Sequence, residues 1–447
     1  MKKYLLLIIL FMTGSLYAQE DLTVMGAIKK ALEKNFDIQL IAGNYQAAKL
    51  QNSWGQAGLI PTFSLNVTNN TALQDNTNNP ATFFPGVLLN DNLQASLQMQ
   101  WTVFSGFAIK INKERFETLQ AQTRGNAIIV IESTIHDVIL AYYSAVVQQR
   151  KMDVLTEVLD YARKERDYFE IKSEMGISTS LDMLEFENQI YTDSTNLLLQ
   201  ELSYNNAMRN MNMIMAEDVG VKYNLTDSLN FSVPVITYEE LQTRMMSDNV
   251  SLKNQFINYE LKELEVSAKK SAYYPVITLN LSTTPAVGYF RLYGDQGFSA
   301  NTNSWSHNAT VNLRYDLFQG MNRKRNVQIA ELQQELAGIE IEQMKLNLSH
   351  QLRSNFELYN TRLKVKNLAV ERLKNASKLW NLGKEKYNLG LINVFNLNAI
   401  KLSYEQAVLN YYDRLYDLLQ THYDLLRLTG EISQQYKIDE NFDPSDN

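Results

Sequence analysis

The chain has 447 residues, 45% of them hydrophobic, with 18 glycines and 7 prolines, which excludes collagen-like, low-complexity and intrinsically disordered classes. Cysteine is absent, which excludes disulfide frameworks, thiolate metal sites and a cysteine nucleophile. The formal net charge of −7 gives no electrostatic reason to expect nucleic acid as a partner.

The N-terminus has the pattern of a secretory signal peptide, which we predict over residues 1–18. Lys2 and Lys3 precede an apolar run, and Ala18 is a small residue at the expected cleavage point. The run is shorter than the roughly 20 residues of a membrane-spanning helix, which argues against an anchor. No later segment is expected to be long and apolar enough to span a membrane as a helix. The mature chain then lies in the periplasm, or in an outer membrane as β-strands.

The sequence repeats itself at a shift of 214 residues, and this repeat defines the predicted domains. We predict a first structural repeat over 19–235, a second over 236–430, and a C-terminal tail over 431–447. The residues that recur at the shift include Asn35 and Asn249, Pro61 and Pro275, Gly106 and Gly320, His136 and His350, and Gly176 and Gly390.

Each repeat is predicted to begin with a helix and to continue with two strands. The helices span about 23–58 and 238–273, and Pro61 and Pro275 end them because proline lacks a backbone donor. Apolar and polar residues then alternate, as in strands of a transmembrane barrel, although a sheet over a soluble core alternates in the same way. The predicted strands are 63–68, 93–103, 277–282 and 309–317, with loops at about 70–91 and 284–306.

After Gly106 and Gly320 the hydrophobic period becomes helical, and these glycines are predicted to serve the sharp exit from strand to helix. The long helices are predicted over 106–173 and 320–388, each roughly 100 Å long. Shorter helices follow the turns at Gly176 and Gly390, over about 181–215 and 395–429. In the last helix an apolar seam, interrupted by Glu405, predicts a neighbouring helix. The seam comprises Leu402, Leu409, Tyr412, Tyr416, Leu419, Tyr423 and Leu426.

Four strands are too few to close a barrel, because single-chain barrels have at least eight. An open sheet edge in lipid leaves backbone groups unpaired, at several kcal/mol each. If the strands lie in a membrane, two or three chains must therefore pool them, giving eight or twelve strands. The long helices would then project away from the membrane and form a tube.

Motifs of four kinds occur in order along the chain, at Leu22–Asn35, Leu59–Pro61, Val103–Gly106 with Leu317–Gly320, and Met175–Leu184 with Leu389–Leu397. Together they resemble the TolC-like outer membrane efflux proteins, also called outer membrane factors. The resemblance covers about residues 20–432. It implies a mixed, mainly α fold: a homotrimer whose twelve-stranded outer-membrane β-barrel continues into a periplasmic α-helical barrel. An equatorial belt would come from 217–236 and 430–447, with the tail equatorial or disordered.

The resemblance also implies the function. Family members are passive outer-membrane ducts of tripartite efflux or type I secretion systems. They dock on a periplasmic adaptor, which joins them to an inner-membrane transporter of the RND, ABC or MFS type. The alternative is a periplasmic coiled-coil scaffold or adhesin without channel activity, which explains the helices but not the strands. We find no nucleophile, phosphate loop or carboxylate pair with supporting context, so neither an enzyme nor a cofactor is predicted.

The resemblance places a periplasmic entrance at the two helical turns. Asp182 is expected either to line this entrance and attract cations or, in the pattern Thr179-x-x-Asp182, to cap its helix. Family members often carry acids at the positions of Asn396 and Ala399, which are neutral here, so no acidic ring is expected from the second repeat. The predicted entrance residues are Gly176, Thr179, Asp182, Glu185, Gly390, Asn393 and Asn396.

Two pairs of residues have more than one interpretation. His136 and His350 would form a ring of six in a trimer, but no cluster at metal-ligand spacing accompanies them, so no metal site is predicted. Trp101 and Tyr315 fit either an aromatic belt at a membrane interface or an ordinary barrel surface.

Overall fold

A computed structural model of the chain describes residues 20–174, 180–229, 237–294 and 297–436. These residues form two compact units. The helical unit contains the described residues up to 44 together with 124–254 and 342–436, and the sheet unit contains 45–123 and 255–341. The predicted domains follow the sequence repeat, whereas each compact unit takes segments from both repeats.

The prediction of one continuous helix at the start of each repeat is wrong, because the chain breaks at equivalent asparagines. In the first repeat Asn35 has an extended ψ of 132°, and in the second Asn249 has a ψ of 115°. The first repeat therefore contains α2 (Val24–Lys34), α3 (Phe36–Gln51) and α4 (Trp54–Ala57), and the second contains α7 (Tyr238–Asp248), α8 (Val250–Lys270) and the short η1 (Ser271–Tyr273).

Both asparagines use their whole amide in the same way. Asn35 Oδ1 accepts a hydrogen bond from the backbone N–H of Asp37 (2.9 Å), and Asn35 Nδ2 donates to the carbonyl of Ile214 (2.8 Å). Asn249 Nδ2 donates to the carbonyl of Leu428 (3.0 Å), which lies 214 residues beyond Ile214. Each asparagine thus satisfies free backbone groups and ties the start of a repeat to the end of its last helix.

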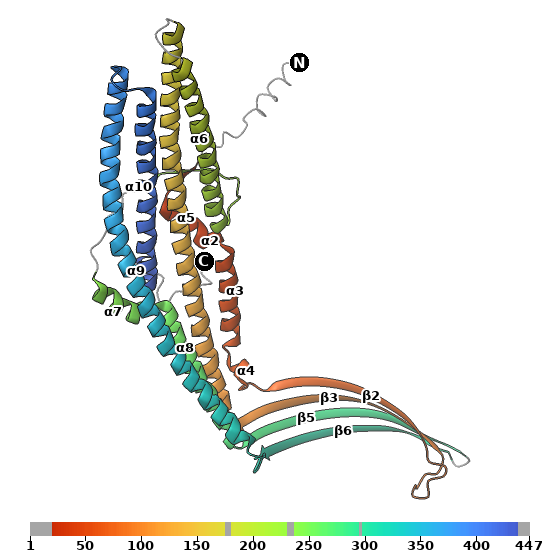
Figure 1. Cartoon of the computed structure of the whole chain (residues 1–447). Helices are drawn as coiled ribbons and strands as arrows, with labels where there is room; N and C mark the ends of the chain where they lie inside the picture. Colours follow the sequence, from red (N-terminus) through yellow and green to blue (C-terminus); the bar gives the residue numbers. More distant parts are fainter. Residues whose placement is uncertain (1–19, 175–179, 230–236, 295–296, 437–447) are drawn as a thin grey trace, which may run out of the picture. The chain divides into compact units, whose positions relative to one another are not determined.

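The four predicted strands exist and are longer than the alternation indicated. They lie side by side in one curved antiparallel sheet of order β2-β3-β5-β6 (Figure 1). Only 76–86 and 294–298 separate the strands within each hairpin, so the longer predicted loops are wrong, and Tyr315 and Leu317 lie beyond the last strand. The strands are β2 (Thr62–Asp75), β3 (Val87–Ser105), β5 (Val276–Tyr293) and β6 (Ser299–Arg314).

Pro285 lies inside β5, where the sequence suggested a loop. On one side it is opposite Trp305 of β6. On the side facing β3, residue pairing stops after Gln94–Ala286 and resumes at Leu97–Thr283, so Pro285 has no paired residue there. Because proline has no N–H to donate, it fits a strand at such an interruption of the ladder.

The long helices match their predictions to within a few residues. Equivalent helices have equal lengths, 67 residues for the longer pair and 35 for the shorter pair. Beyond them, the described part of the C-terminal tail begins with α11 (Glu431–Gln435), whose Ile432 is fully buried. The helices are α5 (Ala108–Glu174), α6 (Ser180–Ile214), α9 (Asn322–Asn388) and α10 (Val394–Leu428).

The apolar seam predicted on α10 is partly wrong. Leu402 is 46% exposed, whereas Lys401 and Glu405, which lie one helical turn apart, are buried. Leu419 and Leu426 are buried as predicted. The buried stripe is therefore rotated relative to the predicted one, and Glu405 lies within it.

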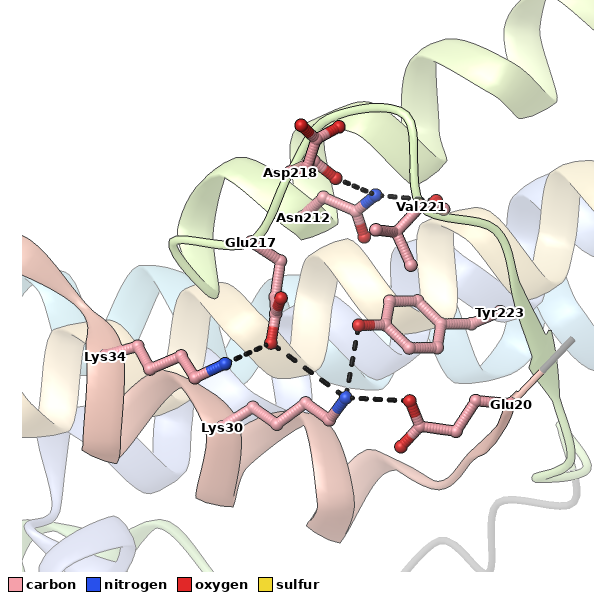
Figure 2. Close-up of polar contacts among 8 residues, drawn as sticks. All are labelled: Glu20, Lys30, Lys34, Asn212, Glu217, Asp218, Val221 and Tyr223. Atoms are coloured by element: carbon pink, nitrogen blue, oxygen red, sulfur yellow. Dashed lines mark hydrogen bonds and ion pairs between the residues drawn. The ribbon is translucent and has the colours of Figure 1, made fainter. Parts of the chain in front are cut away.

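A short parallel pair, β1 (Glu20–Leu22) with β4 (Tyr223–Leu225), joins the two ends of the first repeat. Figure 2 shows the polar contacts beside this pair. Lys30 Nζ lies 3.1 Å from both Glu20 Oε2 and the Tyr223 hydroxyl, and Lys34 Nζ lies 2.8 Å from Glu217 Oε1. Burial lowers the pKa of Lys30, but these hydrogen bonds outweigh it and the net shift is upward. The contacts hold the segment after α6 against α2.

The asparagine breaks give a first prediction. Asn35→Ala removes a helix cap and leaves the carbonyl of Ile214 without its donor, so we expect a loss of about 1–3 kcal/mol in the free energy of unfolding. Denaturant titration of the detergent-solubilised protein, followed by circular dichroism, measures the change. Asn35→Ser keeps an acceptor for the cap and should recover part of the loss. Unchanged unfolding of Asn35→Ala would show that the helix break does not depend on this side chain.

Candidate functional site

Over most of the length of the four strands, the register places their apolar residues on one face of the sheet. Leu65 is opposite Leu97, Met99 is opposite Leu281, and Leu281 is opposite Ala309. Many of these side chains are exposed on the single chain, and Leu313 is 66% exposed. The apolar face includes Phe63, Leu65, Val67, Leu93, Ala95, Leu97, Met99, Ile277, Leu279, Leu281, Val287, Ala309, Val311 and Leu313.

The height of this apolar face fits a bilayer. From Ile277 to Val287, ten residue steps at ~3.3 Å give about 33 Å along β5, or about 25 Å of height at a tilt of ~40°. A lipid-facing barrel band has this height. Trp305 Nε1 donates to Thr283 Oγ1 (2.8 Å), so the hydroxyl within the band is hydrogen-bonded. Near the Ile277 end of the apolar face, Trp101 Nε1 donates to the carbonyl of Leu59 (2.9 Å).

The opposite face of the sheet is lined by hydroxyl and amide side chains. Thr284 Oγ1 of β5 donates to Ser96 Oγ of the neighbouring β3 (3.1 Å), so the even-numbered residues of β3 and β5 share this face. The sheet is thus apolar on one side and hydrophilic on the other. The polar face includes Ser64, Asn66, Thr68, Gln94, Ser96, Gln98, Gln100, Thr278, Asn280, Ser282, Thr284, Thr302, Ser304, Ser306, Asn308, Thr310 and Asn312.

The junctions between strand and helix contain two consecutive residues in the left-handed region. Gly106 (φ 64°) is followed by Phe107 (φ 69°), and Gly320 (φ 57°) by Met321 (φ 63°). A Cβ atom at Gly106 would lie 2.4 Å from the carbonyl oxygen of Ser271, so only glycine fits there. The sequence identified the two glycines but missed their left-handed neighbours. Pro61 and Pro275 directly precede β2 and β5.

The predicted entrance residues are only partly described. Gly176 and Thr179 lie outside the described residues, and Asp182 lies in α6 with its side chain outside them. In the second repeat Gly390 has a φ of 71°, and Asn393 Oδ1 accepts from the backbone N–H of Asn396 (2.9 Å), which makes Asn393 the cap of α10.

The exposed Asn396 contributes its backbone N–H to this cap. Glu185 Oε1, on the half-buried Glu185, accepts from Asn398 Nδ2 (3.1 Å) and so links α6 to α10. The structure therefore brings Asn393 and Asn396 together, and places Glu185 against the other repeat.

A buried ionic triad, absent from the sequence prediction, joins the same two helices. Lys401 Nζ lies 3.0 and 2.8 Å from the two carboxylate oxygens of Asp193, and 3.6 Å from Glu405 Oε1. Lys401 and Asp193 are each 3% exposed and Glu405 is 5% exposed. Burial raises the pKa of Glu405, with Lys401 opposing the shift. The sequence did contain a sign of this triad. Lys401 and Glu405 are three or four residues from buried apolar residues of α10, which places the two charged residues on the buried face of the helix.

The repeat-equivalent histidines have different environments. His136 is buried, with Nδ1 3.0 Å from Asp137 Oδ1 and Nε2 2.9 Å from Asp424 Oδ1, whereas His350 is exposed. Burial lowers the pKa of His136, but the two carboxylates outweigh it and the net shift is upward. Among the residues that the structure describes, no group of three or more His, Cys, Asp or Glu side chains has a geometry suited to a metal ion.

Comparison with known protein families shows which family combines an amphipathic sheet with long helices in this way. A model of the outer membrane efflux protein family matches residues 27–216 and 244–431, one stretch in each repeat. The chain belongs to the outer membrane efflux protein family. It is therefore a channel protein of the outer membrane, as the sequence motifs predicted. No curated protein sequence matches this efflux protein significantly.

Solved structures share the fold of the efflux protein at low sequence identity. The Campylobacter jejuni CmeC outer membrane channel is 14% identical, with a TM-score of 0.73 over 94% of this chain and 89% of that chain. The open state of the Neisseria gonorrhoeae MtrE outer membrane channel is 15% identical, with a TM-score of 0.68 over 91% of this chain and 88% of that chain. The Vibrio cholerae outer membrane protein VceC is 13% identical, with a TM-score of 0.67 over 91% and 96%.

The expectation that no later segment is long and apolar enough to span a membrane as a helix is wrong for the efflux protein. Within the described residues, Ala108–Ile171 of α5 contains an 18-residue window apolar enough to cross a membrane. This window is 61% buried inside the protein, as expected for a core helix. The apolar side chains of α5 pack in the core of the helical unit, where Ile135 and Ile139 are 1% and 0% exposed.

The buried triad of the efflux protein gives a second prediction. Lys401→Met leaves Asp193 and Glu405 buried without a cation, so we expect the free energy of unfolding to fall by about 3–5 kcal/mol. The exposed pair Lys374–Glu371 (3.7 Å) provides the control, since Lys374→Met should change it by about 0–1 kcal/mol. Denaturant titration measures both variants.

A rescue variant shows whether the stability lost in Lys401→Met comes from the uncompensated charges or from altered packing. Adding Asp193→Leu and Glu405→Gln to Lys401→Met removes the uncompensated carboxylates, and we expect most of the lost stability to return. If Lys401→Met is as stable as the native protein, or if the triple variant is no better than the single one, the triad does not stabilise the contact between α6 and α10.

Proposed function

We propose that the efflux protein acts as a homotrimeric duct for passive export, and the observation that carries this proposal is the two-faced sheet with open edges. β2 and β6 each have one sheet neighbour, so both outer edges carry backbone groups that need partners. Lipid supplies no hydrogen bonds, so the edge β2 of one chain must pair with β6 of another. Three chains then give a closed barrel of twelve strands, with the apolar face toward lipid and the polar face toward water.

Exposed apolar residues on the helices support assembly of several copies. On α6, Leu184, Tyr191 and Leu198 follow a seven-residue spacing and are 57%, 69% and 67% exposed. A heptad seam of this kind packs against another helix. We propose that this seam contacts the neighbouring subunit in the helical barrel. A coiled-coil scaffold without channel activity would use the seam equally well but would leave the amphipathic strands without a role.

The proposed duct works with two further proteins. A periplasmic adaptor engages the helical turns, and an inner-membrane transporter of the RND, ABC or MFS type supplies the energy. We propose that the entrance lies at the turns of both repeats and opens when the adaptor binds. The residues assigned to it are Gly176, Thr179, Asp182, Glu185, Gly390, Asn393 and Asn396.

The proposed orientation of the sheet gives a third prediction. Leu97→Arg and Leu313→Arg place a cation on the apolar face, at a cost of roughly 2–4 kcal/mol near the bilayer midplane, so membrane assembly should fail or weaken. Gln98→Arg, on the polar face of the same strand, should assemble normally. Outer-membrane fractionation and the mobility of the unboiled protein on gels report the trimer. Equal assembly of all three variants would contradict the orientation, and a soluble monomer in the native protein would favour the scaffold.

The proposed entrance gives a fourth prediction. Asp182→Asn removes up to three negative charges from the trimer, while its side-chain oxygen can still accept a capping-box hydrogen bond at the start of the helix, so the cation preference of the channel should fall with little loss of stability. Single-channel recordings in planar bilayers measure the preference. Asp182→Ala should lose the same charge and also the capping-box hydrogen bond, at about 0.5–1.5 kcal/mol of stability. If selectivity is untouched in both variants while only Asp182→Ala lowers the melting temperature, Asp182 serves as a cap.

A further inference from the structure

The polar face of the sheet becomes apolar at the end that carries the loops 76–86 and 294–298. Along β5, Thr278, Asn280 and Ser282 point to this face, and the same alternation places Phe290 and Leu292 on it. Leu292 is opposite Leu88 of β3. A water-lined surface thus ends in an apolar zone.

Two further phenylalanines, one from each loop, gather around Phe290. The ring centroids of Phe290 and Phe298 are 5.5 Å apart, those of Phe84 and Phe298 5.6 Å, and those of Phe84 and Phe290 6.4 Å. Phe84 and Phe298 remain 47% and 43% exposed despite these contacts. We call Phe84, Phe290 and Phe298 the phenylalanine cluster.

Backbone contacts fix the residues beside Phe84 and the backbone of Phe298. Gly86 has a φ of 132°, and a Cβ atom there would lie 2.6 Å from the carbonyl oxygen of Tyr293, so only glycine allows this close approach. The N–H of Leu292 donates to the carbonyl of Phe298 (2.9 Å). The positions of Phe84 and Phe298 therefore follow from the backbone, and their exposed ring faces remain available to solutes.

The rest of the polar face carries almost no charge. Within the four strands, the one charged side chain on this face is Arg314, at the opposite end from the cluster. Amide and hydroxyl groups offer hydrogen bonds to water and polar solutes without selecting by charge. A narrow apolar ring disfavours water and hydrated ions, which is how hydrophobic constrictions gate.

We propose that the phenylalanine cluster forms an apolar collar at the loop end of the duct, which holds back hydrophilic molecules and passes uncharged, apolar or amphiphilic solutes. This inference rests on the proposed trimeric barrel, in which three copies of the cluster meet around one lumen. The cargo class that fits the collar and the uncharged lining is an apolar or amphiphilic organic molecule rather than a hydrated cation.

Cysteine labelling in intact cells tests the collar directly, because the chain has no native cysteine. Ser282→Cys places a thiol on the polar face beyond the collar, and Thr77→Cys places one in the exposed loop before it. The probe is a maleimide on a hydrophilic polyethylene glycol chain too large for porins. Labelling of each thiol is measured in three proteins: one with all phenylalanines, one with Phe84→Ser and one with Phe83→Ser. Phe83 is the matched control, because it lies in the same loop and is 96% exposed.

We expect the thiol at 282 to react at least roughly tenfold more slowly than the thiol at 77, and Phe84→Ser but not Phe83→Ser to abolish most of this difference. Fast labelling at 282 with all phenylalanines present overturns the collar while leaving the lumen intact. Equal effects of Phe84→Ser and Phe83→Ser also overturn it. A thiol at 282 that stays unreactive in every background, together with a reactive Leu97→Cys, overturns the proposed barrel itself.

Discussion

The unpaired edges of the four-stranded sheet are the constraint on which the rest of the structure depends. A sheet with one apolar face is stable in lipid only when every backbone donor and acceptor has a partner, and β2 and β6 leave two rows of them free. The chain cannot meet this requirement alone. The need for further copies therefore follows from the strands alone, before any detail of the helices. The exposed apolar seam on α6, proposed above to contact a neighbouring subunit, is consistent with this need.

The duplication is strict in backbone geometry and loose in side-chain chemistry. Asn35 and Asn249 break their helices with the same hydrogen bonds, and Gly106 and Gly320 share the left-handed exit from strand to helix. In contrast, His136 is buried between two carboxylates and His350 is exposed. Features that shape the backbone persist because both copies must fit the same ring, whereas side chains adapt to the different neighbours that each copy meets.

The sequence predicted what depends on periodicity and on local breaks. The long helices and the strand-to-helix glycines follow from patterns within a few residues, so α5 and α9 were placed closely. The breaks at Asn35 and Asn249 were missed because each asparagine combines a local cap with a hydrogen bond to a carbonyl 179 residues away, which no local pattern indicates. The extent of β5 was missed because Pro285 and Gly288 are typical of loops, although cross-strand pairing carries the strand through both.

The candidate site was predictable in outline for the same reason. Asn393 follows the local rule for a helix cap, and its Oδ1 accepts from the backbone N–H of Asn396. The triad of Lys401, Asp193 and Glu405 joins different repeats, so the spacing on α10 indicates Lys401 and Glu405, but no local pattern pairs them with Asp193. Its physical consequence is specific: a contact between α6 and α10 that depends on buried charges of opposite sign tolerates little sliding, because displacement would leave a charge uncompensated. The triad therefore fixes the register of the two helices close to the turns where the proposed entrance lies, and an opening motion must either keep this contact or exchange it as a unit.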